Sequence, residues 1–171
     1  AMLCLLASIN VSTGFRAVFK ANNALAIKLN QSSALDFNAR LPVLTQLRAQ
    51  QEALLVRNSF YPFAWMRLAY LRNQTTSNRA GAFDALRFAD TISQPDNIGG
   101  LERILMWHDY ADVHTPADKA REKEMLRTAY RLKWYYLYEA LAKNNLREVF
   151  MGALQEDPAL LAQWQVRHPV R

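Results

Sequence analysis

The stretch FYPFAWMRLAYLRNQTTSNRAGAFDALRFADTISQPD, residues 60–96, decides the fold class of this chain. Its first part, residues 62–72, begins with a proline, which a first helical turn tolerates, and places apolar residues at helical spacing. Residues 73–78 are all polar and predict a turn, after which residues 79–92 carry a second apolar stripe rich in alanine. Two helices joined by a short turn lie antiparallel, so the stretch predicts a helical hairpin.

The same signals predict helices along the rest of the chain. No stretch alternates apolar and polar residues for long enough to be a convincing strand. Thr115 and Pro116 form a capped helix start with proline at the first helical position. We predict an all-α protein of eight or nine helices, in which antiparallel hairpins stack as a repeat or form an irregular helical bundle. The further helices are expected at residues 15–29, 42–57, 101–113, 119–143 (one helix or two), 146–154 and 158–168.

The composition fits a chain of about one domain. The chain has 171 residues, of which 51% are hydrophobic, and this is enough to build a core. With 5 glycines and 6 prolines, turn-forming residues are scarce and helix is favoured. Cys4 is the only cysteine, so no intrachain disulfide can form. We predict a single helical domain over residues 16–171, preceded by an apolar segment, residues 1–15.

The apolar segment carries no charged side chain, and the first charge is that of Arg16. A full membrane span needs about 20 apolar residues, so the segment is too short, and it lacks the basic start of a signal peptide. Two interpretations remain open: a buried amphipathic helix, or the trailing half of a transmembrane helix that serves as a tether. The basic residues Arg16, Lys20 and Lys28 would favour a cytoplasmic side by the positive-inside rule.

The hairpin of the opening stretch also carries a side-chain pattern. Its positions are Trp65-x2-Leu68-Ala69, Ala82-x3-Leu86-x2-Ala89 and Pro95, and its first half is echoed by Trp107-x2-Tyr110-Ala111 and Trp134-x2-Leu137. The pattern resembles a tetratricopeptide repeat, in which small residues let two helices approach closely and a proline ends the pair. The resemblance covers about one fifth of the chain. Its spacing departs by a residue or two, and Arg72 stands where the family favours an aromatic side chain.

The resemblance implies a scaffold. Tetratricopeptide-like proteins bind peptides or partner domains in a concave groove, and short membrane-anchored versions resemble parts of bacterial secretion and polysaccharide assemblies. We therefore expect a non-catalytic protein–protein interaction module of a larger envelope complex. It would be associated with the inner membrane, on the periplasmic rather than the cytoplasmic side. The candidate partner-binding residues are Arg67, Tyr70, Arg103 and Trp107.

Catalytic motifs find little support, so we predict that the chain is not an enzyme and uses no metal or cofactor. Histidine and aspartate bind divalent metals, so a small metal-dependent hydrolase is one hypothesis, and its residues would be His108, Asp109, Asp112 and His114. His-Asp phosphohydrolases need a further upstream histidine, which the chain lacks, and a solvated helix end explains the cluster better. Cys4 lies in an apolar run, and the chain has neither Gly-x-Ser-x-Gly nor a phosphate-binding loop.

A basic stripe gives the alternative function. The chain has a net charge of +6, and four cations spaced by four residues follow one helix face: Lys119, Lys123, Arg127 and Arg131. Neighbouring tyrosine and tryptophan residues make an anionic partner conceivable, either a nucleic acid, a membrane or an acidic protein. Acidic residues interleave with the stripe, and the ordinary interpretation is a solvated helix face. A nucleic-acid-binding bundle is kept as the alternative to the scaffold.

Overall fold

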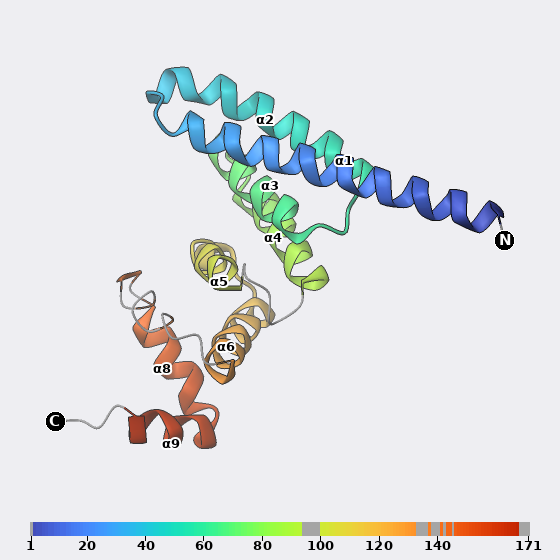
Figure 1. The fold of residues 1–171 in the computed structure, drawn as a ribbon. Helices are drawn as coiled ribbons and strands as arrows, with labels where there is room; N and C mark the ends of the chain where they lie inside the picture. Colours follow the sequence, from blue (N-terminus) through green and yellow to red (C-terminus); the bar gives the residue numbers. More distant parts are fainter. Residues whose placement is uncertain are drawn as a thin grey trace. The chain divides into compact units, whose positions relative to one another are not determined.

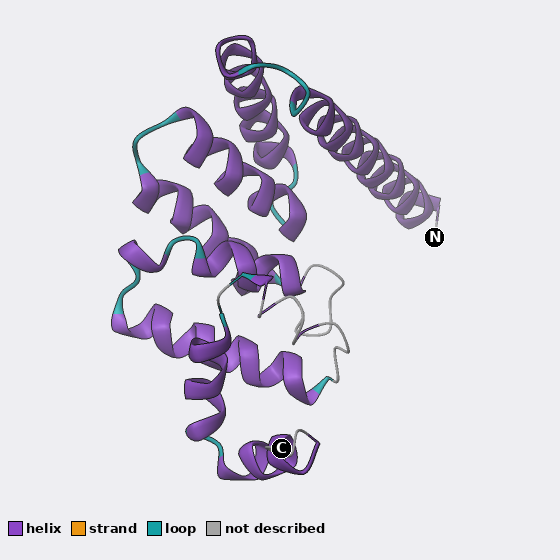
Figure 2. Cartoon of the chain, turned by 90° about the vertical axis from the view of Figure 1, so that its left-hand side faces the viewer, coloured by secondary structure: helices purple, strands orange, loops and turns teal. Residues whose placement is uncertain are grey.

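The computed structural model describes the backbone of residues 2–93, 100–132, 137, 141, 143–144 and 146–167, and the side chains among them from Arg16 onward. Within these residues it holds eight α-helices, one short 3-10 helix and no strand (Figure 2). The predicted all-α class is therefore confirmed. The chain divides into two compact units, Ala1–Ile92 (unit 1) and Ser93–Arg171 (unit 2). Whether residues 16–171 behave as one domain stays a prediction.

Unit 1 consists of four helices, each packed against the next (Figure 1). They are α1 (Met2–Ser32), α2 (Phe37–Arg57), α3 (Pro62–Thr75) and α4 (Arg79–Ile92). The connections between them are three or four residues long, which makes neighbouring helices antiparallel. The core of the unit includes the buried side chains of Leu44, Leu47, Leu68, Leu71, Phe83 and Leu86.

The α3–α4 hairpin is the element that the opening stretch predicts. Ala69, Ala82 and Ala89 are 0% exposed, so the small residues of the pattern lie in the close-packed interior. The Trp65 ring packs against Phe88 with centroids 4.6 Å apart, and its Nε1 donates a hydrogen bond to the carbonyl of Ser59 at 2.7 Å. The predicted antiparallel hairpin is thus present, whereas its membership of a tetratricopeptide-like repeat stays a prediction, and Pro95 lies outside the described residues.

The start of α2 differs from the expectation. The sequence predicts a start near Pro42, whereas the helix begins at Phe37, because the Asp36 carboxylate accepts a hydrogen bond from Ala39 N at 3.0 Å and caps it. Pro42 then lies inside the helix, where the missing N–H leaves one carbonyl without its helical donor. Because the φ angle of proline is already helical, Pro42 fits inside the helix, and the Asp36 cap starts the helix about one turn before the proline.

Helix α1 runs without interruption from Met2 to Ser32, across the predicted boundary between the apolar segment and the domain. Its end at Ser32 lies three residues beyond the end that the sequence predicts, residue 29. Among the residues that the structure describes, no helix combines the length and the apolarity that crossing a bilayer requires. A membrane tether at or before residue 15 stays a prediction.

Unit 2 contains α5 (Gly100–His108), a 3-10 turn η1 (Ala111–Val113), α6 (Pro116–Arg131), α8 (Arg147–Gln155) and α9 (Pro158–Arg167). The predicted helix 101–113 is shorter, because the chain tightens into the 3-10 turn after His108. The predicted cap of α6 is confirmed: Thr115 and Asp118 form a reciprocal capping box, with Pro116 in the first turn. Trp134 and most of its neighbours in the predicted run 119–143 lie outside the described residues.

Candidate functional site

Arg67, a predicted partner-binding residue, sits in a polar network between three helices. Its Nη1 donates hydrogen bonds to the carbonyl of Asn22 at 2.9 Å, to Asn22 Oδ1 at 3.2 Å and to Gln51 Oε1 at 3.0 Å. Asn22 and Gln51 are 1% and 0% exposed. Burial lowers the pKa of the Arg67 guanidinium, with Tyr61 acting in the opposite direction. The guanidinium therefore joins α1, α2 and α3 from within.

The other three predicted partner-binding residues also make contacts inside their own units. Tyr70, half-buried on α3, accepts a hydrogen bond from Arg40 Nη2 at 2.8 Å. Arg103 and Trp107 are buried on α5, and Trp107 Nε1 donates to the carbonyl of Asp118 at 3.3 Å. Arg67 and Tyr70 thus belong to unit 1, and Arg103 and Trp107 belong to unit 2. A direct partner contact by any of them stays a prediction.

The predicted basic stripe of α6 is largely neutralised by carboxylates. Arg127 forms ion pairs with Glu124 and Glu156, both at 2.9 Å, and Lys123 also pairs with Glu156. Arg131 pairs with Asp157 at 2.8 Å and with Glu124 at 3.2 Å. Glu156 and Asp157 connect α8 to α9, so this α6 ion-pair cluster ties three elements together. The fourth residue of the stripe, Lys119, is exposed, and its ammonium has no partner among the described residues.

The ion pairs shift the acid–base properties of the cluster. The hydrogen bond from Lys123, followed by that from Arg127, lowers the pKa of Glu156. The backbone hydrogen bond from Leu160, followed by the side chain of Arg131, lowers the pKa of Asp157. Burial acts to raise the pKa of Glu124, but its two arginine partners together outweigh burial and lower it. All three carboxylates are therefore held in the ionised form.

These shifts predict an acid-sensitive unit 2. A carboxyl group whose folded pKa is lowered stabilises the fold above its unfolded pKa, and this contribution is lost as the pH falls through the folded value. We expect the unfolding midpoint to drop below about pH 4, and Glu156→Gln to flatten that drop. Thermal unfolding from neutral to acid pH measures it, with the exposed Glu148→Gln on α8 as the control. Parallel curves for wild type and Glu156→Gln would contradict the assignment.

The histidine cluster lies where α5 meets α6. Nδ1 of His108 is 2.9 Å from Glu122 Oε1, and Nδ1 of His114 is 3.8 Å from Glu122 Oε2. His114 Nε2 is 3.0 Å from the carbonyl of Trp107, so this nitrogen carries the proton and donates. Asp109 is exposed. In the described part of the chain, no three histidine, cysteine or carboxylate side chains are grouped as a metal site would need. The histidines instead contact the buried carboxylate of Glu122, and this contact connects α5 to α6.

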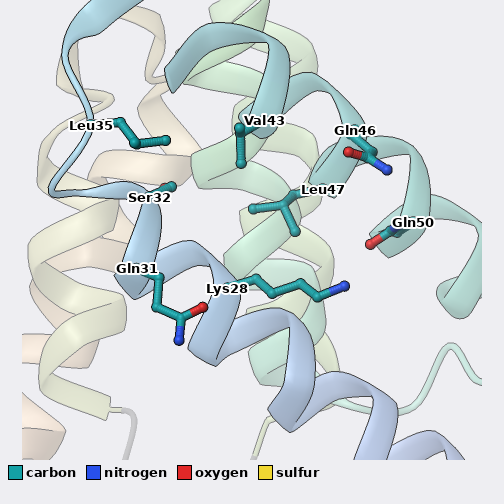
Figure 3. Close-up of a pocket in the computed structure, with 8 residues that line it drawn as sticks. All are labelled: Lys28, Gln31, Ser32, Leu35, Val43, Gln46, Leu47 and Gln50. Atoms are coloured by element: carbon teal, nitrogen blue, oxygen red, sulfur yellow. The ribbon is translucent and has the colours of Figure 1, made fainter. Parts of the chain in front are cut away.

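A groove between α1 and α2 was not predicted from the sequence. It encloses about 310 Å³ and is lined by Lys28, Gln31, Ser32, Leu35, Val43, Gln46, Leu47 and Gln50. Figure 3 shows Lys28 and Gln31 from α1 and Gln46 and Gln50 from α2 around the apolar side chains of the floor. None of these four polar side chains makes a hydrogen bond to another described residue, in contrast to those of the Arg67 network. The i, i+3 and i, i+4 spacing of these polar pairs indicates only that each pair shares one helix face, so no local signal in the sequence indicates this α1–α2 groove.

A second hollow, the α2–α4 pocket, carries both signs of charge. It encloses about 340 Å³ and is lined by Arg48, Glu52, Arg72, Thr76, Asn78 and Gly81. Arg72 donates from Nε and Nη2 to Glu52 Oε1, both at 3.2 Å, and from Nη1 to the carbonyl of Gly81 at 3.3 Å. Arg48 donates to Thr75 Oγ1 at 2.9 Å. Glu52 Oε2 accepts no hydrogen bond from the described residues, so the pocket presents a carboxylate oxygen near two guanidinium groups.

Comparison with known proteins gives one partial similarity. No family model matches the chain, and no solved structure matches it. A protein of Pseudomonas aeruginosa described as an "Amino acid binding protein" is 27% identical over 139 residues. The aligned part covers 80% of this chain but 36% of that protein, so the chain spans about a third of the length of the relative that it matches.

Proposed function

We propose that this chain is a non-catalytic interaction scaffold that binds a short segment of a partner protein in the α1–α2 groove. The observation that carries the proposal is the polar rim of the groove, formed by Lys28, Gln31, Gln46 and Gln50. These side chains make no hydrogen bond to another described residue, and they surround an apolar floor. Gln46 and Gln50 are one turn apart on α2, and both line a hollow that also contains apolar side chains. Polar groups arranged around an apolar floor are typical of recognition sites.

The chemistry of the rim defines the partner segment. Glutamine amides both donate and accept, so Gln46 and Gln50 suit the peptide groups of an extended chain. Lys28 is the one charged residue in the lining, and it favours a carboxylate on the partner. The volume of about 310 Å³ lies at the small end of ligand pockets, and it fits one or two apolar side chains rather than a whole domain.

The wider setting of the proposal comes from the α3–α4 hairpin. Its buried alanines and its tryptophan support stacking of tetratricopeptide-like hairpins, which serve as platforms for other proteins. We propose on this basis a membrane-associated assembly of a bacterial envelope, on the periplasmic side, as its setting. The nucleic-acid alternative loses support because the α6 carboxylates already neutralise Lys123, Arg127 and Arg131.

Peptides selected from a random library on the full chain test the groove. We expect them to share an apolar side chain next to a carboxylate, and we expect Gln46→Ala with Gln50→Ala to weaken them by about tenfold or more. The double variant Gln163→Ala with Gln165→Ala removes two exposed glutamines from α9 and serves as the control. Titration calorimetry gives the affinities. Selected peptides that bind the groove variant as tightly as the wild type would refute the proposal.

Binding of a free amino acid is a second candidate function. The similarity to the Pseudomonas aeruginosa protein suggests it, and the α2–α4 pocket supports it independently by its charges. A zwitterion needs a cation for its carboxylate and an anion for its ammonium group. Arg48 and the unused oxygen of Glu52 offer both on neighbouring turns of α2.

A thermal-shift screen of the standard amino acids decides this second candidate. We expect one or a few of them to raise the unfolding temperature, since a ligand that binds only the folded state stabilises it. Glu52→Gln is expected to abolish the shift, while Glu148→Gln on α8 is expected to leave it unchanged. No shift with any amino acid at millimolar concentration would eliminate this function and leave the scaffold proposal untouched.

A further inference from the structure

The net positive charge of the chain comes entirely from unit 1. Residues 1–92 contain ten lysines and arginines and four acidic residues, whereas residues 93–171 contain eleven of each. The net charge of +6 therefore belongs to the first unit, and the second unit is neutral. Residues 1–35 and 53–83 contain no acidic residue at all. The basic stripe of α6 thus belongs to the unit whose net charge is zero.

Three of these cations gather at one end of the α1–α2 pair. The hydrogen bond from Gln51 Nε2 to Asn22 Oδ1, 3.2 Å long, fixes the antiparallel register of the two helices. In this register Arg16 and Lys20 on α1 lie at the end where α2 terminates at Arg57. All three side chains are exposed, and none has an ion pair with another described residue.

Large apolar side chains stand exposed at the same end. Val56 is 90% exposed, Phe60 is 80% exposed and Phe19 is 46% exposed. The Phe19 ring contacts the edge of Tyr61 with centroids 6.1 Å apart, which places the α2–α3 connection against α1. Single exposed apolar residues are common on protein surfaces. Here three of them lie among three cations that have no ion pair with another described residue, so this end of the α1–α2 pair carries a patch that is both apolar and basic.

Helix α1 continues beyond this patch. It has 31 residues against the 21 of α2, and Figure 1 shows its first half extending past the end of α2. The sequence of that half, residues 2–15, carries no charge. An uncharged helix that leaves the protein between cations and aromatic rings is the arrangement expected at a bilayer interface.

We propose that this end of unit 1 docks on an anionic lipid bilayer. Arg16, Lys20 and Arg57 would contact lipid phosphates, and Phe19 and Phe60 would enter the boundary between headgroups and acyl chains. The inference rests on the membrane association included in the proposed function, and it specifies the surface responsible. A nucleic acid would also attract the cations, but an uncharged helical extension matches a lipid phase and has no counterpart in phosphate recognition.

Co-sedimentation of the full chain with vesicles tests this docking surface. The vesicles contain phosphatidylglycerol with phosphatidylcholine, or phosphatidylcholine alone. We expect binding to the anionic vesicles that weakens with added salt. The triple variant Arg16→Ala, Lys20→Ala, Arg57→Ala should weaken it by on the order of a hundredfold. The control, Lys119→Ala, Lys143→Ala, Arg147→Ala, removes the same charge from exposed residues of unit 2 and should bind as the wild type does.

Several outcomes would overturn the docking surface. Equal binding to neutral vesicles would assign the contact to apolar residues alone, and equal loss in the two triple variants would assign it to net charge. The patch would instead be a nucleic-acid surface if duplex DNA binds the wild type but not the Arg16, Lys20 and Arg57 variant, and if the wild type does not bind vesicles. Peptide binding in the α1–α2 groove, measured on the same variants, reports on the scaffold function separately. Circular dichroism confirms that each variant is folded.

Discussion

Replacing Phe150 by alanine is expected to destabilise unit 2 by about 3–5 kcal/mol. Phe150 is 1% exposed, and its ring lies edge-on to Trp164 at 5.3 Å and to Tyr130 at 5.9 Å between centroids. These three rings come from α6, α8 and α9, so the buried ring of Phe150 contributes to the packing of all three helices. Truncation removes both the transfer free energy of the ring and the packing of the two aromatic neighbours around the cavity.

Urea denaturation followed by tryptophan fluorescence measures this loss, since Trp164 is itself a member of the cluster. The control is Val166→Ala on α9, a side chain that is 83% exposed, where we expect a change within about 0.5 kcal/mol. A loss below about 1 kcal/mol for Phe150→Ala would mean that the cluster collapses around the missing ring and does not hold the three helices together.

The hairpins of this protein could be predicted because their signals are local. Residues 79–92 coincide with α4, and the capped start at Thr115 coincides with that of α6. Capping and apolar spacing depend on residues within one or two helical turns, so they can be recognised from residues close together in the sequence. Pro42 shows the limit of such rules, because a cap placed one turn earlier outweighed the usual position of a proline.

Whether each charged residue forms an ion pair could not be predicted in the same way. The spacing of Lys123, Arg127 and Arg131 correctly places them along one helix. It gives no information about their partners Glu156 and Asp157, which are distant in the sequence. A cation looks equally free in the sequence whether it is solvated or paired. Only the tertiary structure separates this neutralised stripe from the exposed cations of α1 and α2.

Arg67→Ala is the second substitution with a large expected effect, about 3 kcal/mol on the stability of unit 1. In the sequence Arg67 is an exposed-looking residue between Trp65 and Leu68, and we predicted that it contacts a partner. In the structure its guanidinium makes three hydrogen bonds to Asn22 and Gln51. Removing it leaves buried amide oxygens without a charged donor, which costs more than losing an exposed hydrogen bond.

Chemical denaturation of Arg67→Ala beside Arg57→Ala separates an internal from an external role. Arg57 is exposed at the end of α2 and has no ion pair among the described residues, so its removal should change stability by less than about 0.5 kcal/mol. Arg67→Lys should recover part of the loss, since one ammonium group can replace some but not all of the contacts of a guanidinium. If Arg67→Ala leaves the stability unchanged and instead abolishes peptide binding, the network is dispensable and Arg67 is a contact residue after all.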